Sequence, residues 1–499
     1  MQKIIGKTTS VCPVCLQPIP ADKVVGEDGN IYMEKVCPEH GYWRTLIWEG
    51  SEASYIDWAA HNRYSPLELS FTKPVQNGCP NDCGLCCDHK QATCCTLLEL
   101  TNRCNLSCPV CFASAGTATE LKDLPLEELA RQYDYLMSHG GPYNIQLSGG
   151  EPTMRDDLAE VIALGREKGF TFFQLNTNGI RIAEENGYAE QLAIAGLSTV
   201  FLQFDGLDDE IYRILRGRAL KELKLKAIEN CKRAGLPVVL VPTIAKGVND
   251  QSLGEIIRFA LDRAPHVRGV HIQPITFLGR NNMDPDQARL TIPAVLRCIE
   301  SQTDGLMKTG DFSGGGAESP YCSFHASYLR NGSGLKALPK RQGSCCCQSS
   351  ETRDTVAQQW SAKSSCYDDK TSLQVNCCSS GEQSSQQEED RDCCCNGVDS
   401  MRPSDGDSCC GSGYELIDQT SKKSTGWCVD SDTASLDEFL QKTVENTFTL
   451  SGMIFQDAWN LDLARLQRCY ICEVDSDHGM VPFCAYNLTN IYGKALYRR

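Results

Sequence analysis

The chain has 499 residues, enough for two or three structural units, and its 48 Lys and Arg against 64 Asp and Glu give a formal net charge of −16 at pH 7. This acidic balance argues against a nucleic-acid partner, because sequence-independent binding needs a basic face that neutralises phosphates. Hydrophobic residues make up 41% of the chain, which excludes wholesale disorder. The unusual feature of the composition is its 30 cysteines.

The cellular compartment determines whether those cysteines are reduced thiols or form disulfides. Residues 1–10 are mixed and polar, without the apolar core of a secretory signal peptide, and no uninterrupted apolar run reaches the roughly 18 residues of a spanning helix. We therefore expect a cytoplasmic protein whose thiols stay reduced. Reduced cysteines at short, fixed spacings are typical of metal or cluster ligands rather than of disulfides.

Residues 1–78 are predicted to form a small module pinned by a metal ion, similar to a zinc knuckle or a rubredoxin. Cys12, Cys15, Cys37 and His40 give the pattern Cys-x2-Cys…Cys-x2-His. His40 is the weakest of the four, because a histidine beside Gly41 is often a turn residue. We therefore expect the three cysteines to bind a mononuclear iron or zinc ion.

Residues 79–95 carry a second set with a full complement of four thiolates, in the pattern Cys-x3-Cys-x2-Cys-x7-Cys. Its members are Cys79, Cys83, Cys86 and Cys94. Four thiolates can close an auxiliary iron–sulfur cluster that relays electrons or pins the structure, and they suit zinc equally well. Cys87 directly follows Cys86, and Cys95 directly follows Cys94. The sequence therefore leaves open which cysteine of each adjacent pair is the ligand.

From residue 96 to 335, apolar segments of strand length alternate with helical patterns. The predicted strands are 96–100, 143–147, 171–175, 199–203, 238–241 and 270–272. The predicted helices are 125–137, 158–168, 182–195, 220–234 and 253–263. This alternation predicts an α/β fold, a partial (β/α)6 barrel of the TIM type with a parallel sheet and with its chemistry at the carboxyl ends of the strands.

Three cysteines follow the first predicted strand, at the carboxyl end where the chemistry is expected. Cys104, Cys108 and Cys111 form Cys-x3-Cys-x2-Cys. A cubic iron–sulfur cluster usually takes four thiolates, so three leave one iron open to an exogenous ligand. The alternative is a zinc site that lacks one ligand.

Glycines and short polar residues end the following strands. In Ser148-Gly149-Gly150-Glu151, the glycines let the backbone approach a ligand and the carboxylate of Glu151 can accept from an ammonium group. Further candidates for cofactor contacts are Asn176, Asn178, Gln203, Asp205 and Gln273. Each alone could be a turn or capping residue, but their coincidence at consecutive strand ends favours a ligand site.

These motifs resemble the radical S-adenosylmethionine (radical SAM) superfamily over residues 96–279. The resemblance implies that Cys104, Cys108 and Cys111 are catalytic and hold a [4Fe–4S] cluster whose open iron binds the amino-acid end of SAM. It also implies that the Gly-Gly-Glu segment positions the SAM amino group and that reductive cleavage yields a 5′-deoxyadenosyl radical for C–H activation. A low-potential electron donor such as ferredoxin or flavodoxin would then be a partner.

Three further stretches are similar to one branch, the tetraether lipid synthase family, formerly described as class D radical SAM methylases of a pterin precursor. They are 12–15 with 37–41, then 78–86, and then 482–487. The resemblance implies a rubredoxin-like iron, several auxiliary clusters and a transferase that joins lipid chains through a carbon–carbon bond, with peripheral membrane contact. Two alternatives stay open: a radical SAM methylase of a pterin-like small molecule, and a non-enzymatic thiol-rich metal-binding protein.

The composition changes again near residue 340. Residues 341–428 are rich in Ser and Cys and poor in apolar residues, so we predict a disordered low-complexity insertion. Residues 436–499 are predicted to form a C-terminal domain in which Cys469 and Cys484 hold another auxiliary cluster, with Cys472 and Cys322 as further candidates. Cys472 and the additional cysteines Cys87 and Cys95 depart from the family pattern, so the assignment of the cluster ligands stays open.

Overall fold

The computed structural model describes residues 3–60, 75–116, 123–315, 318–331, 334–339, 349–361 and 446–498. These residues belong to one unit, made of 1–365 and 440–499. A second unit, 366–439, lies outside the described residues, and so does most of the predicted insertion at 341–428. Among the described helices, none is long and apolar enough to cross a membrane.

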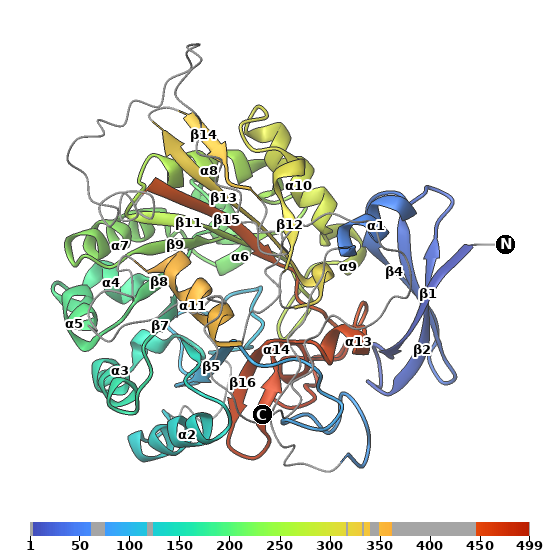
Figure 1. Ribbon diagram of the computed structural model, residues 1–499, viewed down its shortest axis with the longest axis horizontal. Coiled ribbons are helices and arrows are strands. Elements are labelled where there is room, and N and C mark those ends of the chain that lie inside the picture. The colour runs from blue at the N-terminus through green and yellow to red at the C-terminus, as the bar shows by residue number, and fades with distance from the viewer. Residues whose placement is uncertain are drawn as a thin grey trace, which may run out of the picture. The chain divides into compact units, whose positions relative to one another are not determined.

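A four-stranded antiparallel sheet opens the chain (Figure 1). Its strands, which pair in chain order, are β1 (Lys3–Val11), β2 (Pro18–Val25), β3 (Ile31–Cys37) and β4 (Gly41–Trp48). Buried residues alternate along β3, as expected when one face of a strand packs and the other meets solvent. Helix α1 (Glu52–Ala59) follows, and the side chain of its N-cap Ser51 accepts from the Ser54 N–H.

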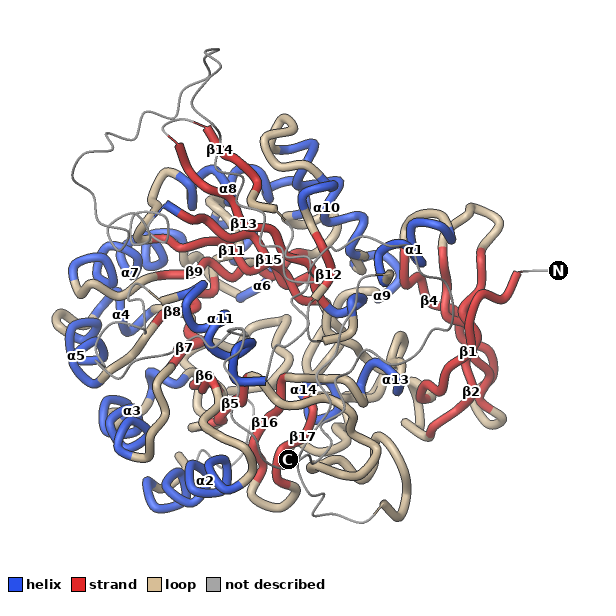
Figure 2. The backbone as a smooth tube through the Cα atoms, in the orientation of Figure 1, coloured by secondary structure: helices blue, strands red, loops and turns tan. Residues whose placement is uncertain are grey.

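A larger sheet forms the body of the described chain (Figure 2). Its central strands are parallel and lie in chain order: β5 (Cys95–Glu99), β6 (Asn144–Ser148), β7 (Phe173–Thr177), β8 (Thr199–Gln203), β9 (Val238–Val241) and β11 (Val267–Pro274). These six strands match the predicted ones to within a few residues. The predicted α/β partial barrel with a parallel sheet is therefore confirmed.

Helices follow the strands of this sheet in the sequence, and most of them lie along its outer side (Figure 1). They are α2 (Leu126–Ser138), α3 (Leu158–Glu167), α4 (Ile180–Glu184), α5 (Tyr188–Ala195), α6 (Asp209–Arg216), α7 (Lys221–Arg233) and α8 (Leu253–Leu261). The single helix predicted at 182–195 is two helices, because the chain passes through Gly187 at φ 82° between α4 and α5. Helix α6 was not predicted, although Asp208 caps its start and Gly217, at φ 84°, ends it.

Segments remote in the sequence extend the large sheet at both edges. Strand β15 (Thr447–Met453) pairs in parallel with β11, and β16 (Ile471–Asp475) pairs in parallel with β5. The remaining strands are β10 (Thr243–Ile244), β12 (Ser313–Gly314), β13 (Ser323–Asn331), β14 (Gly334–Ala337) and β17 (Gly479–Pro482). The residues that we predicted as a separate C-terminal domain therefore add strands to the barrel sheet. Pairing between strands that are so far apart in the sequence has no local sequence pattern, so it could not be predicted.

Part of the predicted disordered insertion is a helix, α11 (Ser349–Trp360). Ala357 and Trp360 are buried against Phe201 and Val239, and the Trp360 ring lies 5.6 Å from the Phe201 ring at an interplanar angle of 82°. The strand neighbours of Phe201 and Val239 belong to the main core instead, so α11 covers the opposite face of the sheet. The prediction of disorder is therefore wrong for residues 349–361, where two buried side chains anchor the helix.

Short helices complete the described structure. They are α9 (Pro285–Ala288), α10 (Ile292–Gln302), α13 (Leu463–Leu466) and α14 (Phe483–Tyr486). The segment that contains α9 leaves the carboxyl end of β11, and α13 and α14 flank β16 and β17 in sequence. These connections bring the C-terminal residues to both sheets: the Ile491 N–H donates to the Pro13 carbonyl over 2.9 Å, in the first turn of the N-terminal sheet.

Candidate active site and metal centres

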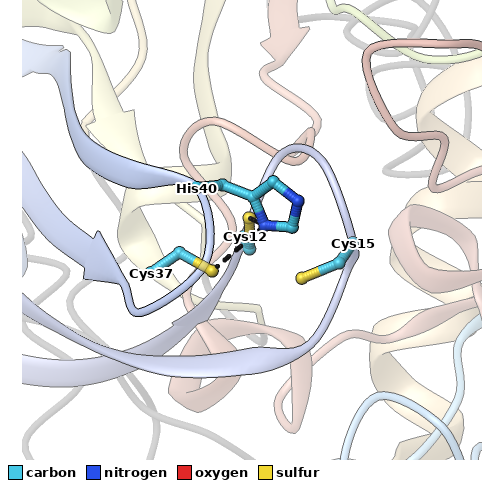
Figure 3. A group of neighbouring side chains, drawn as sticks. All are labelled: Cys12, Cys15, Cys37 and His40. Carbon is cyan, nitrogen blue, oxygen red and sulfur yellow. Dashed lines mark hydrogen bonds between the residues drawn. The ribbon is translucent and has the colours of Figure 1, made fainter.

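The N-terminal sheet carries a compact group of four potential ligands (Figure 3). Cys12 and Cys15 lie in the turn after β1, and Cys37 and His40 lie at the turn between β3 and β4. All four ligand atoms lie within 4.8 Å of one another, and His40 Nδ1 is 3.3 Å from Cys37 Sγ. A tetrahedral ion with Zn–S bonds of about 2.3 Å would place sulfur ligands about 3.8 Å apart. The group therefore fits one zinc or iron ion and includes His40, which the sequence reasoning had ranked lowest.

The electrostatics of this group favour metal binding. The pKa of Cys37 lies at about 7, because hydrogen bonds from His40 and from the backbone N–H groups of residues 39 and 40 outweigh the effect of burial, which raises it. The pKa of Cys15 is raised, first by burial and also by Cys12 beside it. Metals bind the thiolate form, so a low thiol pKa favours binding at neutral pH.

The second candidate centre is the loop after β5, which carries Cys104, Cys108 and Cys111, all partly buried. Arg280, in the segment after β11, holds the backbone of this loop. Its Nε donates to the Cys108 carbonyl over 2.7 Å and its Nη2 to the Ala115 carbonyl over 3.1 Å. Its backbone N–H and carbonyl also pair with those of Cys111, at 2.9 and 2.8 Å. Arg280 was not predicted, because the two segments are remote in sequence and only the fold brings them together.

Glycines set the position of the same loop. A Cβ on Gly149, at φ 124°, would collide with the Thr101 carbonyl oxygen, and one on Gly150 would collide with that of Arg103. The Gly150 N–H donates to the Thr101 carbonyl over 2.8 Å. We had expected these glycines to let the backbone approach a ligand. In the structure, they let the end of β6 approach the start of the cysteine loop.

The surroundings of the cysteine loop disfavour the thiolate form of its cysteines when no cation is bound. Burial raises the pKa of Cys104 to about 12 and also raises that of Cys108, although Arg216 lowers the latter. Neutral thiols would therefore dominate near pH 7 without a cation. The positive charge of bound iron would reverse this preference and release protons on binding. The donor set thus fits the three-thiolate cluster that the sequence predicted.

Glu151 links two strand ends beside this loop and is 2% exposed. Its Oε1 accepts from the Thr153 N–H, from the Thr153 hydroxyl and from the Thr177 hydroxyl, at 3.1, 2.6 and 2.6 Å. Its Oε2 accepts from the Asn178 N–H over 2.7 Å. A carboxylate oxygen can accept about two hydrogen bonds, so Oε2 keeps capacity for one further donor.

The predicted asparagines connect the strand ends to the cysteine loop. Asn178 Nδ2 donates over 2.7 Å to Asn105 Oδ1, which lies between the first two cysteines of the loop. Asn176, two residues earlier, donates from Nδ2 to Gln146 Oε1 over 3.3 Å. Asn178 thus joins the end of β7 to the loop, and Asn176 joins β7 to β6.

Asp205 forms an ion pair inside the chain. Its Oδ2 accepts from Arg216 Nε over 2.7 Å and its Oδ1 from Arg216 Nη2 over 2.8 Å, with Asp205 fully buried. Arg216 Nη1 also donates to the Val110 carbonyl in the cysteine loop over 3.2 Å. The paired Asp205 and Arg216 therefore support the loop.

The other predicted cofactor residues also lie at strand ends. Gln203 Oε1 accepts from the buried Lys224 Nζ over 3.0 Å, and burial lowers the pKa of Lys224 to about 7. Ser148 is buried, and its carbonyl accepts from the Leu100 N–H over 3.0 Å. Gln273 is half-buried in β11, where it pairs with Thr243 of β10. All nine predicted cofactor residues thus lie at the carboxyl ends of β6, β7, β8 and β11.

The set at residues 79–95 is divided in the structure. Cys79, Cys83 and Cys86 line one small pocket, whereas Cys94 is not among its lining residues and its Sγ lies 3.8 Å from Cys95 Sγ. His89 lines the same pocket, and its buried Nε2 has no hydrogen-bond partner among the described residues. A buried imidazole nitrogen without a partner is a suitable metal ligand. His89 could therefore complete the set, and the sequence offered a signal that we missed: Cys86 and His89 repeat the Cys-x2-His spacing of Cys37 and His40.

The C-terminal cysteines lie near Cys322. Burial raises the pKa of Cys484 to about 12, and Cys322 adds to this effect. Burial also raises the pKa of Cys469, with contributions from Cys484 and Cys472. Arg465 Nη2 donates to Cys322 Sγ over 3.3 Å. Cys322, Cys469 and Cys484 thus influence one another electrostatically, while Cys472 Sγ lies 3.6 Å from the Thr93 hydroxyl, next to β5.

Comparison with known families assigns the fold of the barrel. Residues 98–260 match the model of the radical SAM superfamily, and residues 4–49 match that of the HMPTM N-terminal zinc ribbon domain. The chain therefore has an α/β radical SAM fold with a Cys-rich zinc ribbon before it. The cofactors of this superfamily are a [4Fe–4S] cluster and SAM, as the cysteine loop predicted.

Individual relatives cover parts of the chain. A protein of Methanocaldococcus jannaschii named 7,8-dihydro-6-hydroxymethylpterin dimethyltransferase is 44% identical over 309 residues, which are 61% of this chain and 60% of that protein. A probable GTP 3′,8-cyclase of Methanothermobacter thermautotrophicus is 32% identical over 33% of this chain and 53% of its own length. The match thus spans about three fifths of the first relative and about half of the second.

Two solved structures are similar to part of the chain at low identity. SuiB of Streptococcus suis bound to S-adenosylmethionine has 17% identity and a TM-score of 0.37, over 44% of this chain and 48% of its own. The anSMEcpe structure with bound AdoMet has 15% identity and a TM-score of 0.35, over 42% of this chain and 59% of its own.

Proposed function

We propose that the chain is a radical SAM enzyme in which Cys104, Cys108 and Cys111 hold the reactive [4Fe–4S] cluster. The chemistry that the bound cluster and SAM supply is reductive cleavage of the sulfonium and abstraction of a substrate hydrogen. The observation that carries this proposal is the three-cysteine loop at the carboxyl edge of a parallel sheet that matches the radical SAM model. Three thiolates would leave one iron open, which is what binding of SAM requires.

The protein's own part is to hold this loop rigid and to present polar groups beside it. Arg280 and the Asp205–Arg216 pair fix the loop backbone from two sides. Glu151 keeps one oxygen able to accept a further hydrogen bond, as an ammonium group would need. We propose the cofactor-binding role for the predicted residues at the strand ends, and a positioning role for Asp205 through Arg216.

A pterin-like heterocycle is the substrate that the relatives favour. The M. jannaschii protein, 44% identical over 309 residues, is named as a pterin dimethyltransferase, and the zinc ribbon model that matches residues 4–49 carries the HMPTM name. We therefore propose transfer of a one-carbon group to such a heterocycle, which was our alternative reading of the sequence. Carbon–carbon bond formation on lipid chains was our first reading and stays a prediction from the motif resemblance. Either reaction requires a low-potential electron donor, such as ferredoxin or flavodoxin.

The test is anaerobic reconstitution of the full chain with iron and sulfide, followed by incubation with SAM and dithionite. One reaction contains a reduced hydroxymethylpterin and a parallel one contains an archaeal-type diether lipid. We expect 5′-deoxyadenosine in both mixtures and a mass increase that matches added methyl groups only on the pterin. A product only from the lipid would contradict the pterin substrate. A preparation without iron, acid-labile sulfide or 5′-deoxyadenosine would contradict the enzyme class as well and would favour the thiol-rich metal-binding alternative.

A further inference from the structure

A second pocket lies between the N-terminal sheet and the barrel, with about 580 Å³ of space between its atoms, open solvent included. Its lining comes from β2, β3, β4 and α1, from residues between 275 and 292, from Tyr321, and from residues between 454 and 465. The volume open to the centres of water-sized molecules is about 30 Å³. This exceeds the roughly 10–15 Å³ that one water needs, so the pocket is hollow. The pocket has its own set of lining residues, separate from the cysteine loop.

One wall of this pocket is aromatic. The rings of Tyr55 and Tyr321 stack at 4.3 Å with an interplanar angle of 13°, and Trp48 lies edge-on to Tyr55 at 5.7 Å. The Tyr321 hydroxyl donates to the Tyr55 carbonyl over 2.9 Å, which fixes one ring against the other. Rings held in this way present a flat apolar surface on which a planar or apolar group can pack.

The pocket lining also includes hydrogen-bond donors without partners. Arg289 Nε, the Thr291 hydroxyl and Arg465 Nε are buried and have no hydrogen-bond partner within the described part of the chain. Arg289 and Thr291 are 8% and 4% exposed. Buried polar groups are almost always paired in native proteins, so three such groups around one pocket point to a ligand that accepts hydrogen bonds.

The two arginines are held in place by their other nitrogens. Arg289 Nη1 lies 3.0 Å from Asp457 Oδ2 and its Nη2 donates to Asp457 Oδ1 over 3.1 Å. Arg465 Nη2 donates to the Tyr321 carbonyl over 2.9 Å. Each guanidinium therefore has a fixed orientation and keeps its Nε–H available, which is the preorganisation that a binding site needs.

The charges around the pocket favour an anion. Lys23, Arg289 and Arg465 line it, against Asp462 in the lining and Asp457 behind Arg289. Lys23 is paired with Asp462 at 2.7 Å, and Arg289 with Asp457. Three cationic groups against two carboxylates leave an excess positive charge at Arg465, which a phosphate or carboxylate would neutralise.

We propose that this pocket binds a small ligand in which a phosphate or carboxylate group is joined to a flat apolar body. The anionic oxygens accept from Arg289 Nε, the Thr291 hydroxyl and Arg465 Nε, and the apolar body packs on the aromatic wall. This site goes beyond the proposed function, because it needs neither the cluster nor SAM.

The test is isothermal titration calorimetry of the full chain with phenyl phosphate, benzoate, inorganic phosphate and phenol as probes. We expect one phenyl phosphate or benzoate to bind per chain, at least about tenfold more tightly than inorganic phosphate or phenol. Preference for phenyl phosphate would identify a phosphate ligand, and preference for benzoate a carboxylate ligand. Absence of binding by both aromatic anions would overturn the proposal, and so would inorganic phosphate binding as tightly as phenyl phosphate.

Two mild variants test the donors. Thr291→Val removes one hydroxyl without changing the side-chain shape, and Arg465→Lys removes Nε while it keeps the charge. Each should weaken binding of the aromatic anion about tenfold, with circular dichroism and melting temperature used to verify folding. Thr45→Val is the matched control, because the Thr45 hydroxyl is also buried and without a partner in the described structure but does not line the pocket. Equal affinities in all three variants and the original chain would contradict the assignment.

The Cys108→Ala variant separates this proposal from the proposed function. It should bind the aromatic anion as the original chain does while it forms no 5′-deoxyadenosine. Loss of probe binding in this variant would show that the pocket depends on the cysteine loop and would overturn its independence.

Discussion

The N-terminal ribbon and the cysteine loop use cysteines at similar spacings but hold them in different ways. In the ribbon, two turns on neighbouring hairpins contribute two ligands each, and the four ligand atoms lie within 4.8 Å of one another. In the loop, one segment contributes all three thiols, and Arg280 and two glycines from other parts of the barrel hold its backbone. A site closed by four protein ligands is suited to a structural ion, whereas one with three keeps a position for a reacting molecule.

The strongest test of this difference is Cys108→Ala. Because only two thiolates would remain on the loop, we expect formation of 5′-deoxyadenosine to fall by more than about 1,000-fold, which corresponds to about 4 kcal/mol in the barrier. The ribbon metal should stay bound. Measurement by liquid chromatography of the nucleoside, together with metal analysis, checks both statements. Undiminished nucleoside release would refute the role of this loop.

The converse variant is Cys37→Ser, which removes one ligand of the ribbon. We expect loss of the mononuclear metal and fast hydrogen exchange in residues 3–48, because metal binding and folding are coupled in such modules. Nucleoside formation should fall by no more than about fivefold, since the loop keeps its own ligands and supports. Cys298→Ser, outside all of the cysteine sets, is the control. A ribbon that exchanges slowly without its metal would show that the ion is not structural.

A third pair of variants asks whether the set at residues 79–95 is closed by His89 or by Cys94. Because His89 lines the pocket of Cys79, Cys83 and Cys86, we expect His89→Ala to lower the iron and sulfide content of the reconstituted chain more than Cys94→Ser does. Loss of nitrogen coupling in pulsed electron paramagnetic resonance should accompany the histidine variant. A larger loss of iron with Cys94→Ser would restore the four-cysteine set predicted from the sequence.

The last variant, Arg280→Gln, removes a support of the cysteine loop and no ligand. Removal of the guanidinium leaves the carbonyls of Cys108 and Ala115 without their donor, so the loop should loosen while all three thiols remain. We expect nucleoside formation about tenfold slower, and a smaller change of the cluster's paramagnetic spectrum on addition of SAM. Arg258→Gln is the control, because that arginine forms an exposed ion pair with Asp304 and should matter little. An unchanged response to SAM would contradict a positioning role for Arg280.

Local patterns predicted much of the barrel. Strand segments at 199–203 and 238–241 agree with β8 and β9 because buried parallel strands are short apolar runs, which a sequence displays directly. Helix α6 was missed because it spans only 209–216, although its capping residues are visible in the sequence. Residues 349–361 were missed for a different reason: the helix is anchored by Ala357 and Trp360, too few side chains to form a recognisable pattern.

In the candidate site, too, some features follow from the local sequence and others depend on tertiary contacts. The types and spacing of Cys104, Cys108 and Cys111 are enough to predict a cluster with three ligands, because ligand chemistry depends on the residues themselves. The residues that hold the cysteine loop in place could not be predicted in this way. Arg280 lies more than 160 residues from the carbonyls to which it donates. Glu151 accepts from Thr177, which lies on a different strand.

The sequence by itself determined the ligand chemistry and the alternation of strands and helices, since both depend on neighbours within a few residues. Only the tertiary structure decided which remote segments complete the sheet, that His40 lies beside three cysteines, that His89 lies in the pocket of Cys79, Cys83 and Cys86, and that Arg289, Thr291 and Arg465 line one pocket. The physical reason is that hydrogen bonds and packing between distant segments depend on distances in space, which spacing along the chain does not encode.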